Sequence, residues 1–170
     1  MLATEFLHGQ GMGNQLFCYV TTRMLAHRLG YDFGIKGLKS AGDSRVNQKG
    51  FYFMNLDYGK EVPDDLERYD EYRHALKTDE WLRTDIRLTD KTLLNIPDNR
   101  IIYGNMQSED YFYDRLDLVK EWLKVREEYD HMDTNGKDMC VLNFRGGDMI
   151  GNPGAYVPRK YWTNAMQRML

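Results

Sequence analysis

A glycine-rich segment near the N-terminus places the strongest constraint on how this chain can fold. Residues 8–15 read His-Gly-Gln-Gly-Met-Gly-Asn-Gln, and they follow a short apolar start at residues 1–7. Apolar residues then recur over residues 16–29 with nearly a helical period, and Gly30 ends the run. The pattern predicts a strand, a glycine turn and a helix. It is not the dinucleotide-binding fingerprint, because the third glycine follows the second by two residues rather than three.

The glycines of this turn have two interpretations, and the residues alone leave both open. They could serve only the strand-to-helix turn, or they could let the backbone pass close to a ligand or a neighbouring domain. In the second case Gly11, Gly13, Asn14 and Gln15 form a cleft loop. Asn14 and Gln15 would then offer side-chain amides to the cleft or cap the helix.

A second glycine-containing segment follows an apolar run much later in the sequence. Residues 139–142 predict a buried strand, and residues 143–148 continue it as Asn-Phe-Arg-Gly-Gly-Asp. The Arg145 guanidinium can grip phosphate oxygens with two hydrogen bonds, and Gly146 and Gly147 let backbone N–H groups approach closely. Ligands of open α/β sheets bind at the carboxyl ends of strands, so the segment predicts a diphosphate site. An ordinary glycine turn with an exposed arginine is the alternative.

Between these segments, strand and helix patterns alternate, which indicates an α/β fold. Residues 31–35, 51–54 and 100–103 are expected strands, and residues 36–49 are an expected loop. Residues 61–80 are rich in charge, and we expect them to form a solvated face or a lid over a substrate.

Two further helices are expected. Ser108 predicts an N-cap, because acidic residues follow it in the first turn, where negative charge is favoured. A core-facing stripe at helical spacing comes after it: Phe112, Leu116, Val119 and Leu123. The last helix is expected from about Pro158, with one apolar face: Trp162, Ala165, Met166 and Met169.

Composition and short motifs exclude several classes of function. The chain is 42% hydrophobic and 29% charged, which is typical of globular proteins, and its net charge of −3 argues against a nucleic-acid partner. Cys18 and Cys140 lie in apolar runs, which predicts buried thiols rather than a disulfide. No His-x-x-x-His, Cys-x-x-Cys or Asp-x-Asp pattern occurs, so no metal is expected. The sequence also contains neither a Gly-x-Ser-x-Gly elbow nor a Walker phosphate loop.

No apolar stretch reaches the roughly 18 residues that a transmembrane helix needs. No signal-peptide pattern precedes the glycine segment either. We therefore expect no transmembrane segment and a cytoplasmic location, in solution or peripheral to a membrane.

Three segments together resemble the alpha-1,2-fucosyltransferase family and its bacterial and viral relatives. Residues 9–19 are similar to the family's N-terminal block of glycines followed by Asn-Gln. Residues 102–112, Ile-Tyr-Gly-Asn-Met-Gln-Ser-Glu-Asp-Tyr-Phe, are similar to its Gly-Tyr-Phe-Gln-Ser-Glu-Lys-Tyr-Phe stretch. Residues 143–148 are similar to its His-x-Arg-Arg-Gly-Asp motif, and Tyr161 and Trp162 stand where the family tends to have paired aromatics.

The third segment departs from the family motif at two positions. Asn143 stands where the family usually has histidine, and Gly146 replaces the second arginine. Asparagine forms hydrogen bonds but carries no charge, so an acid–base role at that position is lost. One arginine instead of two predicts a weaker diphosphate site. A donor sugar related to fucose is therefore the alternative to fucose itself.

The resemblance implies a GT-B-type glycosyltransferase with two Rossmann-like, three-layer α/β domains. We expect residues 1–135 to form the N-terminal domain and residues 136–170 to begin the nucleotide-sugar-binding domain, with polar residues 130–137 as the linker. No helix stop signal occurs near Leu170, which predicts a chain cut or encoded short of the full enzyme.

The implied reaction is inverting, metal-independent transfer of fucose or a related sugar. The donor would be GDP-fucose or a similar GDP-sugar, with no separate cofactor. The acceptor would be an oligosaccharide or a lipid-linked glycan. A non-catalytic saccharide- or nucleotide-binding remnant of such an enzyme is the alternative.

The resemblance also assigns roles within the third segment. Arg145 would stabilise the charge that grows on the departing diphosphate, and Asn143, Gly146 and Gly147 would help to bind the donor. Asp148 could orient Arg145, contact the sugar or act as a base. The orienting role is favoured, because an arginine beside a carboxylate lowers the carboxylate's pKa and makes it a poor base.

The first two segments supply the remaining candidates. Gly11, Gly13, Asn14 and Gln15 would face the cleft from the first domain and approach the donor or the acceptor. Gln107 is a further candidate, because the family's Gln-Ser-Glu stretch lies near the cleft.

Overall fold

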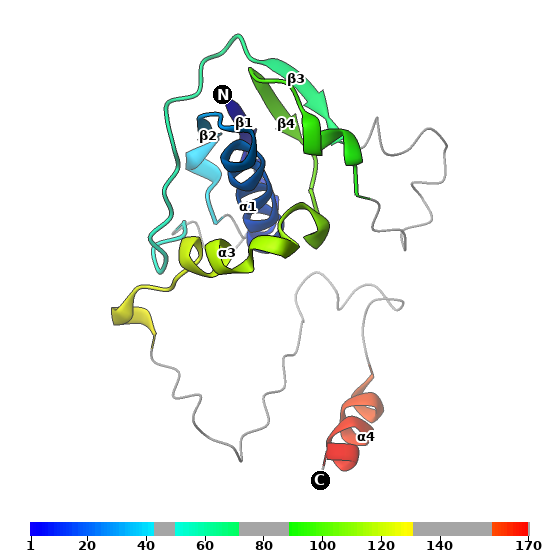
Figure 1. Ribbon diagram of the computed structural model, residues 1–170. Helices are drawn as coiled ribbons and strands as arrows, with labels where there is room; N and C mark the ends of the chain where they lie inside the picture. The colour runs from blue at the N-terminus through cyan, green and yellow to red at the C-terminus, as the bar shows by residue number, and fades with distance from the viewer. Residues whose placement is uncertain (43–49, 72–88, 131–157, 170) are drawn as a thin grey trace. The chain divides into compact units, whose positions relative to one another are not determined.

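The computed structural model describes residues 1–42, 50–71, 89–130 and 158–169. The chain divides into two compact units, Met1–His131 and Met132–Leu170. In the second unit the described residues contain the expected last helix, α4 (Arg159–Met169), drawn in red in Figure 1. The expected strand at residues 139–142 and nearly all of the expected linker lie outside the described residues.

A four-stranded parallel sheet forms the centre of the first unit. The strands are β1 (Leu2–Glu5), β2 (Phe33–Lys36), β3 (Glu67–Asp70) and β4 (Arg100–Tyr103). Their spatial order is β2-β1-β4-β3 (Figure 1). Leu2 lies opposite Phe33 of β2 and Arg100 of β4, so β1 is an interior strand. This sheet gives the unit a mixed α/β character that is compatible with a Rossmann-like fold.

Helix α1 (Met12–Leu29) packs against β1 and β2. It begins after Gly11, and it ends at Gly30, which adopts the left-handed conformation (φ 72°) and donates its N–H to the Ala26 carbonyl. Glycine suits that position because it has no Cβ to clash in the left-handed region. The predicted strand, glycine turn and helix are therefore confirmed.

The hydrophobic core lies between the sheet and α1. Leu2 of β1 and Ile102 of β4, which lie on the same face of the sheet, are completely buried. From α1 the core receives Cys18, Tyr19 and Met24, which are also completely buried. Alternation along the strands and helical spacing along α1 bring these side chains onto facing surfaces.

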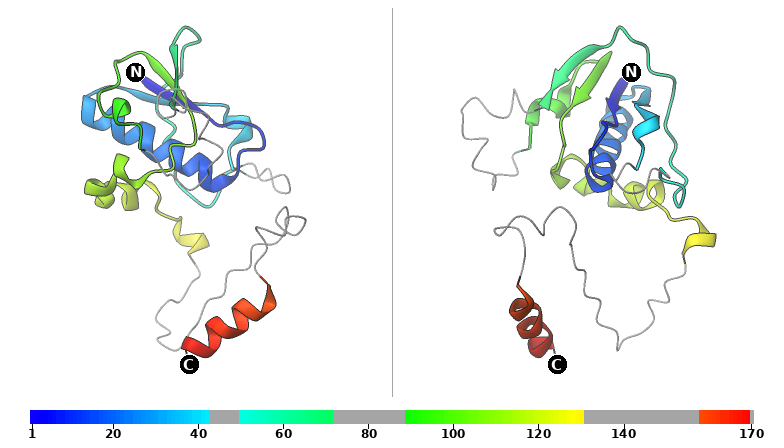
Figure 2. Two further views of the ribbon diagram at one scale, coloured as in Figure 1. Left: turned by 90° about the vertical axis from the view of Figure 1, so that its right-hand side faces the viewer. Right: turned by 180° about the vertical axis from the view of Figure 1, so that it is seen from behind.

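Helix α3 (Leu116–Trp122) lies against α1 (Figure 2). Trp122 packs edge-on against His27 with ring centroids 6.2 Å apart, and the Arg23 guanidinium lies 4.4 Å from the Trp122 ring centroid. A cation over an indole face is stabilising, by about 0.5–1 kcal/mol at exposed sites. This contact attaches α3 to the outer surface of α1.

Ser108 is an N-cap, as predicted, but the helix that it begins is much shorter than the apolar stripe indicates. Its hydroxyl accepts a hydrogen bond from the Asp110 N–H and caps the 3-10 turn η4 (Glu109–Tyr111). Tyr111 is completely buried, and its hydroxyl bonds to Glu71 and to the Asp90 N–H. These bonds hold the turn against the sheet, and a regular helix starts only at Leu116.

The sequence interpretation is wrong in two further places. Residues 51–54 are not a strand, because they form a turn whose Met54 makes only an isolated antiparallel bridge to Val125. Within residues 61–80, which were expected to form a solvated face or a lid, the structure describes 61–71, and there the sequence did not predict strand β3. Among the described strands β3 pairs only with β4, so it lies at an edge of the sheet. An edge strand can form from a polar sequence such as Glu-Arg-Tyr-Asp.

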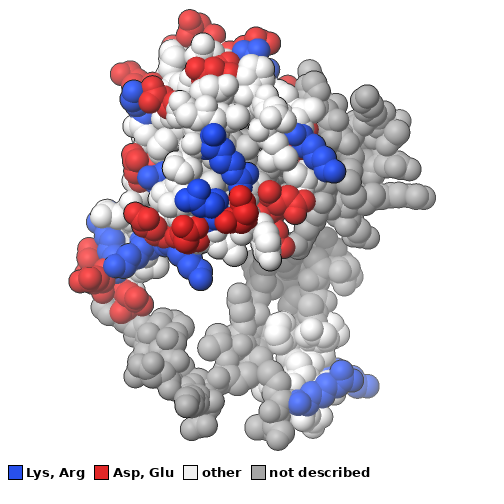
Figure 3. All heavy atoms as spheres, in the orientation of Figure 1, with Lys and Arg blue, Asp and Glu red and all other residues white. Residues whose placement is uncertain are grey.

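Acidic and basic side chains are interspersed over the face of the first unit shown in Figure 3. That face carries no broad surface of one sign, in keeping with the net charge of −3. None of the helices in the described part of the chain combines the length and the apolar character that crossing a bilayer requires.

Candidate functional site

A cavity of about 560 Å³ lies at the carboxyl ends of β1, β3 and β4. Residues 7–11 line it from the loop after β1, and residues 103–105 line it from the end of β4. Asn14 of α1 and Arg68 and Asp70 of β3 complete the described wall. The cavity thus lies outside the carboxyl ends of strands that are neighbours in the sheet. Open α/β sheets bind their ligands at this position.

Two segments that are far apart in the sequence meet beside this cavity. Gln107 donates a hydrogen bond from Nε2 to Asn14 Oδ1 at 2.6 Å. Gln10 Nε2 lies 3.5 Å from Asn105 Oδ1, and the Cys18 thiol donates to the Gly104 carbonyl oxygen at 3.2 Å. These residues belong to segments 9–19 and 102–112, two of the three segments from which the family was predicted.

The four candidates of the cleft loop have different environments. Gly11 and Asn14 line the cavity, whereas Gly13 and Gln15 are not among the described residues that line it. Gln15 is completely buried: its Nε2 donates to the Ser40 carbonyl at 2.8 Å, and its Oε1 accepts from the Gly42 N–H at 2.7 Å. Gly11, which has no side chain to offer, is the N-cap of α1, and the described bonds of Asn14 and Gln15 go to Gln107, Ser40 and Gly42 rather than to the first turn of the helix.

The Cys18 thiol is buried beneath the cavity, as the sequence predicts. Burial raises the pKa of the thiol to about 12, although the Gln10 amide at 3.5 Å acts in the opposite direction. The thiol is therefore protonated at physiological pH and acts as a hydrogen-bond donor to Gly104. Because the thiolate is the nucleophilic form, this environment gives Cys18 a structural role.

One wall of the cavity combines a guanidinium, a phenol and a carboxylate, and a second carboxylate, that of Glu5, bonds to the phenol from behind the described lining. The Arg68 guanidinium carbon lies 4.1 Å from the Tyr103 ring centroid, and Arg68 Nη2 lies 2.6 Å from Asp70 Oδ1. The Tyr103 hydroxyl donates to Glu5 Oε2 at 2.6 Å. Burial and the Glu5 carboxylate raise the pKa of Tyr103 to about 12, so the phenol stays a neutral donor.

The sequence did not predict this wall, because the wall depends on the register between β3 and β4. Asp70 lies opposite Tyr103 in the ladder, and Arg68 lies opposite Ile101, so alternation brings Arg68, Asp70 and Tyr103 onto one face. Polar residues at the carboxyl ends of strands are the available signal. That signal could not be used for β3, because β3 itself was not predicted.

Glu71 lies directly after β3 and supports the cavity from within the protein. Its side chain is only 4% exposed, and its Oε2 accepts a hydrogen bond from the Met106 N–H at 2.8 Å. Oε1 accepts from the Tyr111 hydroxyl at 3.1 Å. A Cβ at Gly104 would lie 2.3 Å from Glu71 Oε2, so the carboxylate fills the space beneath the loop after β4. Glu71 therefore fixes the loop that forms one side of the cavity.

We expect the stability of the protein to report the ionisation of Glu71. Burial is the largest influence, and it raises the pKa of Glu71 above its ordinary value of 4.5. A raised pKa in the folded state favours folding at low pH, and this contribution is lost as the pH rises through the folded-state pKa. Glu71→Gln should therefore gain stability relative to the parent chain in urea unfolding as the pH rises above about 4.5.

Glu67→Gln is the matched control, because it removes an exposed carboxylate from the same part of the chain. If both variants gained stability over the parent chain as the pH rose, the gain could not be assigned to the burial of Glu71.

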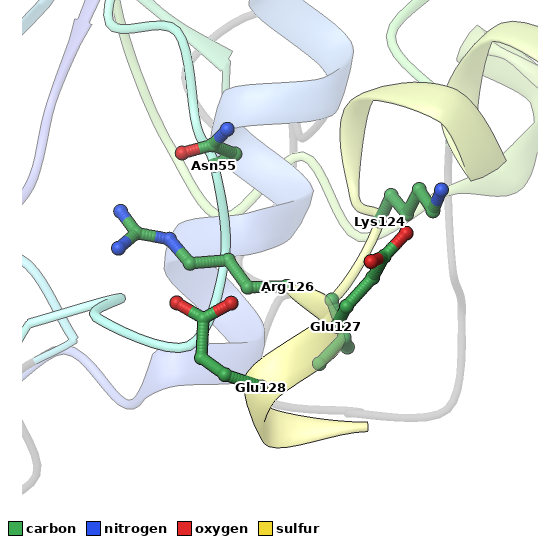
Figure 4. Close-up of a pocket in the computed structure, with 6 residues that line it drawn as sticks. Asn55, Lys124, Arg126, Glu127 and Glu128 are labelled. Atoms are coloured by element: carbon green, nitrogen blue, oxygen red, sulfur yellow. The ribbon is translucent and has the colours of Figure 1, made fainter.

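A second cavity, of about 410 Å³, has no described lining residue from segments 9–19 or 102–112 (Figure 4). It is lined by Asn55 and residues 124–128. The Arg126 backbone N–H donates to the Phe53 carbonyl at 2.9 Å, and its Nε donates to the Met54 carbonyl at 3.1 Å. Arg126 thus holds a loop in place. Figure 4 shows charged side chains of both signs spread around this hollow, and the cavity beside β1 and β4 is the better candidate site.

Five predicted site residues lie outside the described residues: Asn143, Arg145, Gly146, Gly147 and Asp148. In the described ranges, no group of three or more His, Cys, Asp or Glu side chains is placed to hold a metal ion. No protein-family model, curated protein or solved structure matches the chain.

Proposed function

We propose that this chain is a glycosyltransferase, or the N-terminal part of one. It would transfer fucose or a related sugar from a GDP-sugar to an oligosaccharide or lipid-linked glycan. The hydrogen bond between Asn14 and Gln107 is the observation that best supports this proposal. It joins two of the three segments that resemble alpha-1,2-fucosyltransferases, and it does so beside a cavity at the carboxyl ends of parallel strands.

The proposed chemistry is inverting and metal-independent. As the sugar–phosphate bond breaks, negative charge grows on the diphosphate, and Arg145 stabilises that charge with help from the amides of Gly146 and Gly147. Asp148 orients Arg145, and Asn143 contributes hydrogen bonds to the donor. In the first unit, Asn14 and Gln107 present amide groups to a substrate. The proposal includes a GT-B arrangement, with residues 136–170 as the start of the donor domain.

A non-catalytic saccharide- or nucleotide-binding protein is the second candidate. The observation that favours it is Asn143, which stands where the resembled family has an ionisable histidine. Donor turnover separates the two functions, because release of free GDP from GDP-fucose in the presence of an acceptor requires a catalyst.

Calorimetric titration of the chain with GDP-fucose, GDP-mannose, GDP and a UDP-sugar tests the proposed donor. We expect binding that is selective for guanine nucleotides. Arg145→Ala should weaken it by about 10- to 100-fold, the loss expected for a hydrogen-bonded charge contact to phosphate. Arg126→Ala, at the second cavity, is the control and should bind like the parent chain. Equal affinity of Arg145→Ala and the parent chain would rule out the donor site at residues 143–148.

A further inference from the structure

The cavity beside β1 and β4 has a wall that is unsuited to a diphosphate. We infer that Arg68 and Asp70 are specificity-determining residues that make this cavity a site for a neutral saccharide and exclude anions. The assignment of that saccharide as the acceptor rests on the proposed function, whereas the selectivity of the cavity does not.

Charge is the first argument. Among the described lining residues, Arg68 is the one arginine or lysine, and its Nε and Nη2 both contact Asp70 Oδ1, at 3.0 and 2.6 Å. Glu5 supplies a second carboxylate directly behind Tyr103. Among the described residues here, two carboxylates therefore oppose one guanidinium. A diphosphate would lose its hydration here without gaining a net positive partner.

Helix α1 acts in the opposite direction, because Gly11, its N-cap, also lines the cavity. A helix N-terminus is equivalent to about half a positive charge. That is smaller than the full charge of the Glu5 carboxylate, for which the described residues show a hydrogen bond from the neutral Tyr103 hydroxyl. The carboxylates therefore dominate, and the wall as a whole favours neutral ligands.

Hydrogen-bonding capacity is the second argument. The cavity is lined by three side-chain amides, those of Gln10, Asn14 and Asn105, in addition to the Arg68–Asp70 pair. An amide both donates and accepts, a carboxylate accepts, and a guanidinium donates. Sugar hydroxyls also donate and accept. Neighbouring hydroxyls can therefore bond simultaneously to the carboxylate and to the guanidinium.

Rigidity is the third argument. Arg68 is stacked on Tyr103 at 4.1 Å, and the Tyr103 hydroxyl is held by Glu5 at 2.6 Å. Asp70 is only 22% exposed, so its carboxylate is partly protected from solvent. A group that is already oriented loses little side-chain entropy when a ligand binds. The wall is thus prepared for a polar ligand before that ligand arrives.

Amide NMR of the isotope-labelled chain tests this inference, with lactose as the neutral probe and inorganic pyrophosphate as the anionic probe. We expect lactose to shift the side-chain signals of Asn14 and Asn105, and pyrophosphate to leave them unchanged. Asp70→Asn should weaken lactose binding by about tenfold or more. It should also let pyrophosphate shift the same signals, because the variant removes the negative charge that contacts the Arg68 guanidinium.

Asp64→Asn is the matched control. It also breaks an ion pair by neutralising a carboxylate, since Asp64 Oδ1 lies 2.6 Å from Lys36 Nζ, but Asp64 is not a described lining residue. This variant should bind lactose like the parent chain. If Asp70→Asn fails to fold, Arg68→Gln replaces it and should also weaken lactose binding.

Two results would overturn the inference. One is lactose binding that is absent or is unchanged by the Asp70 and Arg68 substitutions. The other is pyrophosphate binding to the parent chain at Asn14 and Asn105. If lactose binds at the cavity but no GDP-sugar is bound or turned over, the selectivity of the cavity stands and the transferase proposal is rejected. Failure of this inference can therefore be told apart from failure of the proposed function.

Discussion

Gly104→Ala is expected to lower the free energy of unfolding by about 2–4 kcal/mol. The new Cβ would lie 2.3 Å from Glu71 Oε2 and 2.7 Å from Glu71 Cβ. Glu71 is only 4% exposed and is held by Met106 and Tyr111, so it cannot move without losing buried hydrogen bonds. Urea unfolding followed by circular dichroism measures the change.

Gly13→Ala is the control for this substitution. Apart from its chain neighbours and the backbone of its own helix, no described atom lies within 4 Å of a Cβ at Gly13, and α1 is helical there. Alanine is favoured over glycine in a helix by up to about 1 kcal/mol, so this variant should be more stable than the parent chain. A Gly104→Ala protein as stable as Gly13→Ala would show that Glu71 is not packed beneath the loop.

Gln15→Met is the second substitution with a large expected effect. Methionine keeps the approximate volume of the side chain but removes its bonds to the Ser40 carbonyl and the Gly42 N–H. Both backbone groups lose their glutamine partner at a position where that side chain is completely buried. An unsatisfied buried polar group costs about 1–3 kcal/mol, so we expect a loss of about 2–4 kcal/mol in urea unfolding.

Gln107→Met is the matched control, because the bond between Gln107 and Asn14 is exposed to solvent. Surface substitutions of this kind change stability by about 0.5 kcal/mol or less. Equal stability of the two variants would contradict the structural role of Gln15. A loss of ligand binding in Gln107→Met, with stability retained, would instead agree with its place beside the cavity.

The sequence predicts the elements whose local pattern is strong. Glycines at both ends of α1 and the apolar pattern of β4 mark those elements, and β4 has the bounds that were predicted. β3 carries no apolar alternation, so nothing local distinguishes it from a solvated loop. Residues 51–54, three of which are aromatic, have strand propensity, but Phe51 packs against Phe6 with ring centroids 5.8 Å apart, and the chain turns there.

The candidate site shows the same division between local and distant information. Asn14 and Gln107 were predicted from the segments in which they occur. Arg68, Asp70 and Tyr103 come together only through the pairing of β3 with β4. Strand register between distant segments is set by tertiary packing, and a single sequence does not display it.

The central place of β1 in the sheet determines when the first unit can fold during synthesis. Thr4 bonds to Ile102, 98 residues further along the chain. At a synthesis rate of about 5–20 residues per second, β1 waits roughly 5–20 s for its second neighbour. During this interval one side of an apolar strand has no native partner, which exposes the nascent chain to wrong pairings and to chaperones. Of the four described strands, the one that leaves the ribosome before the others is thus among the last to be completed.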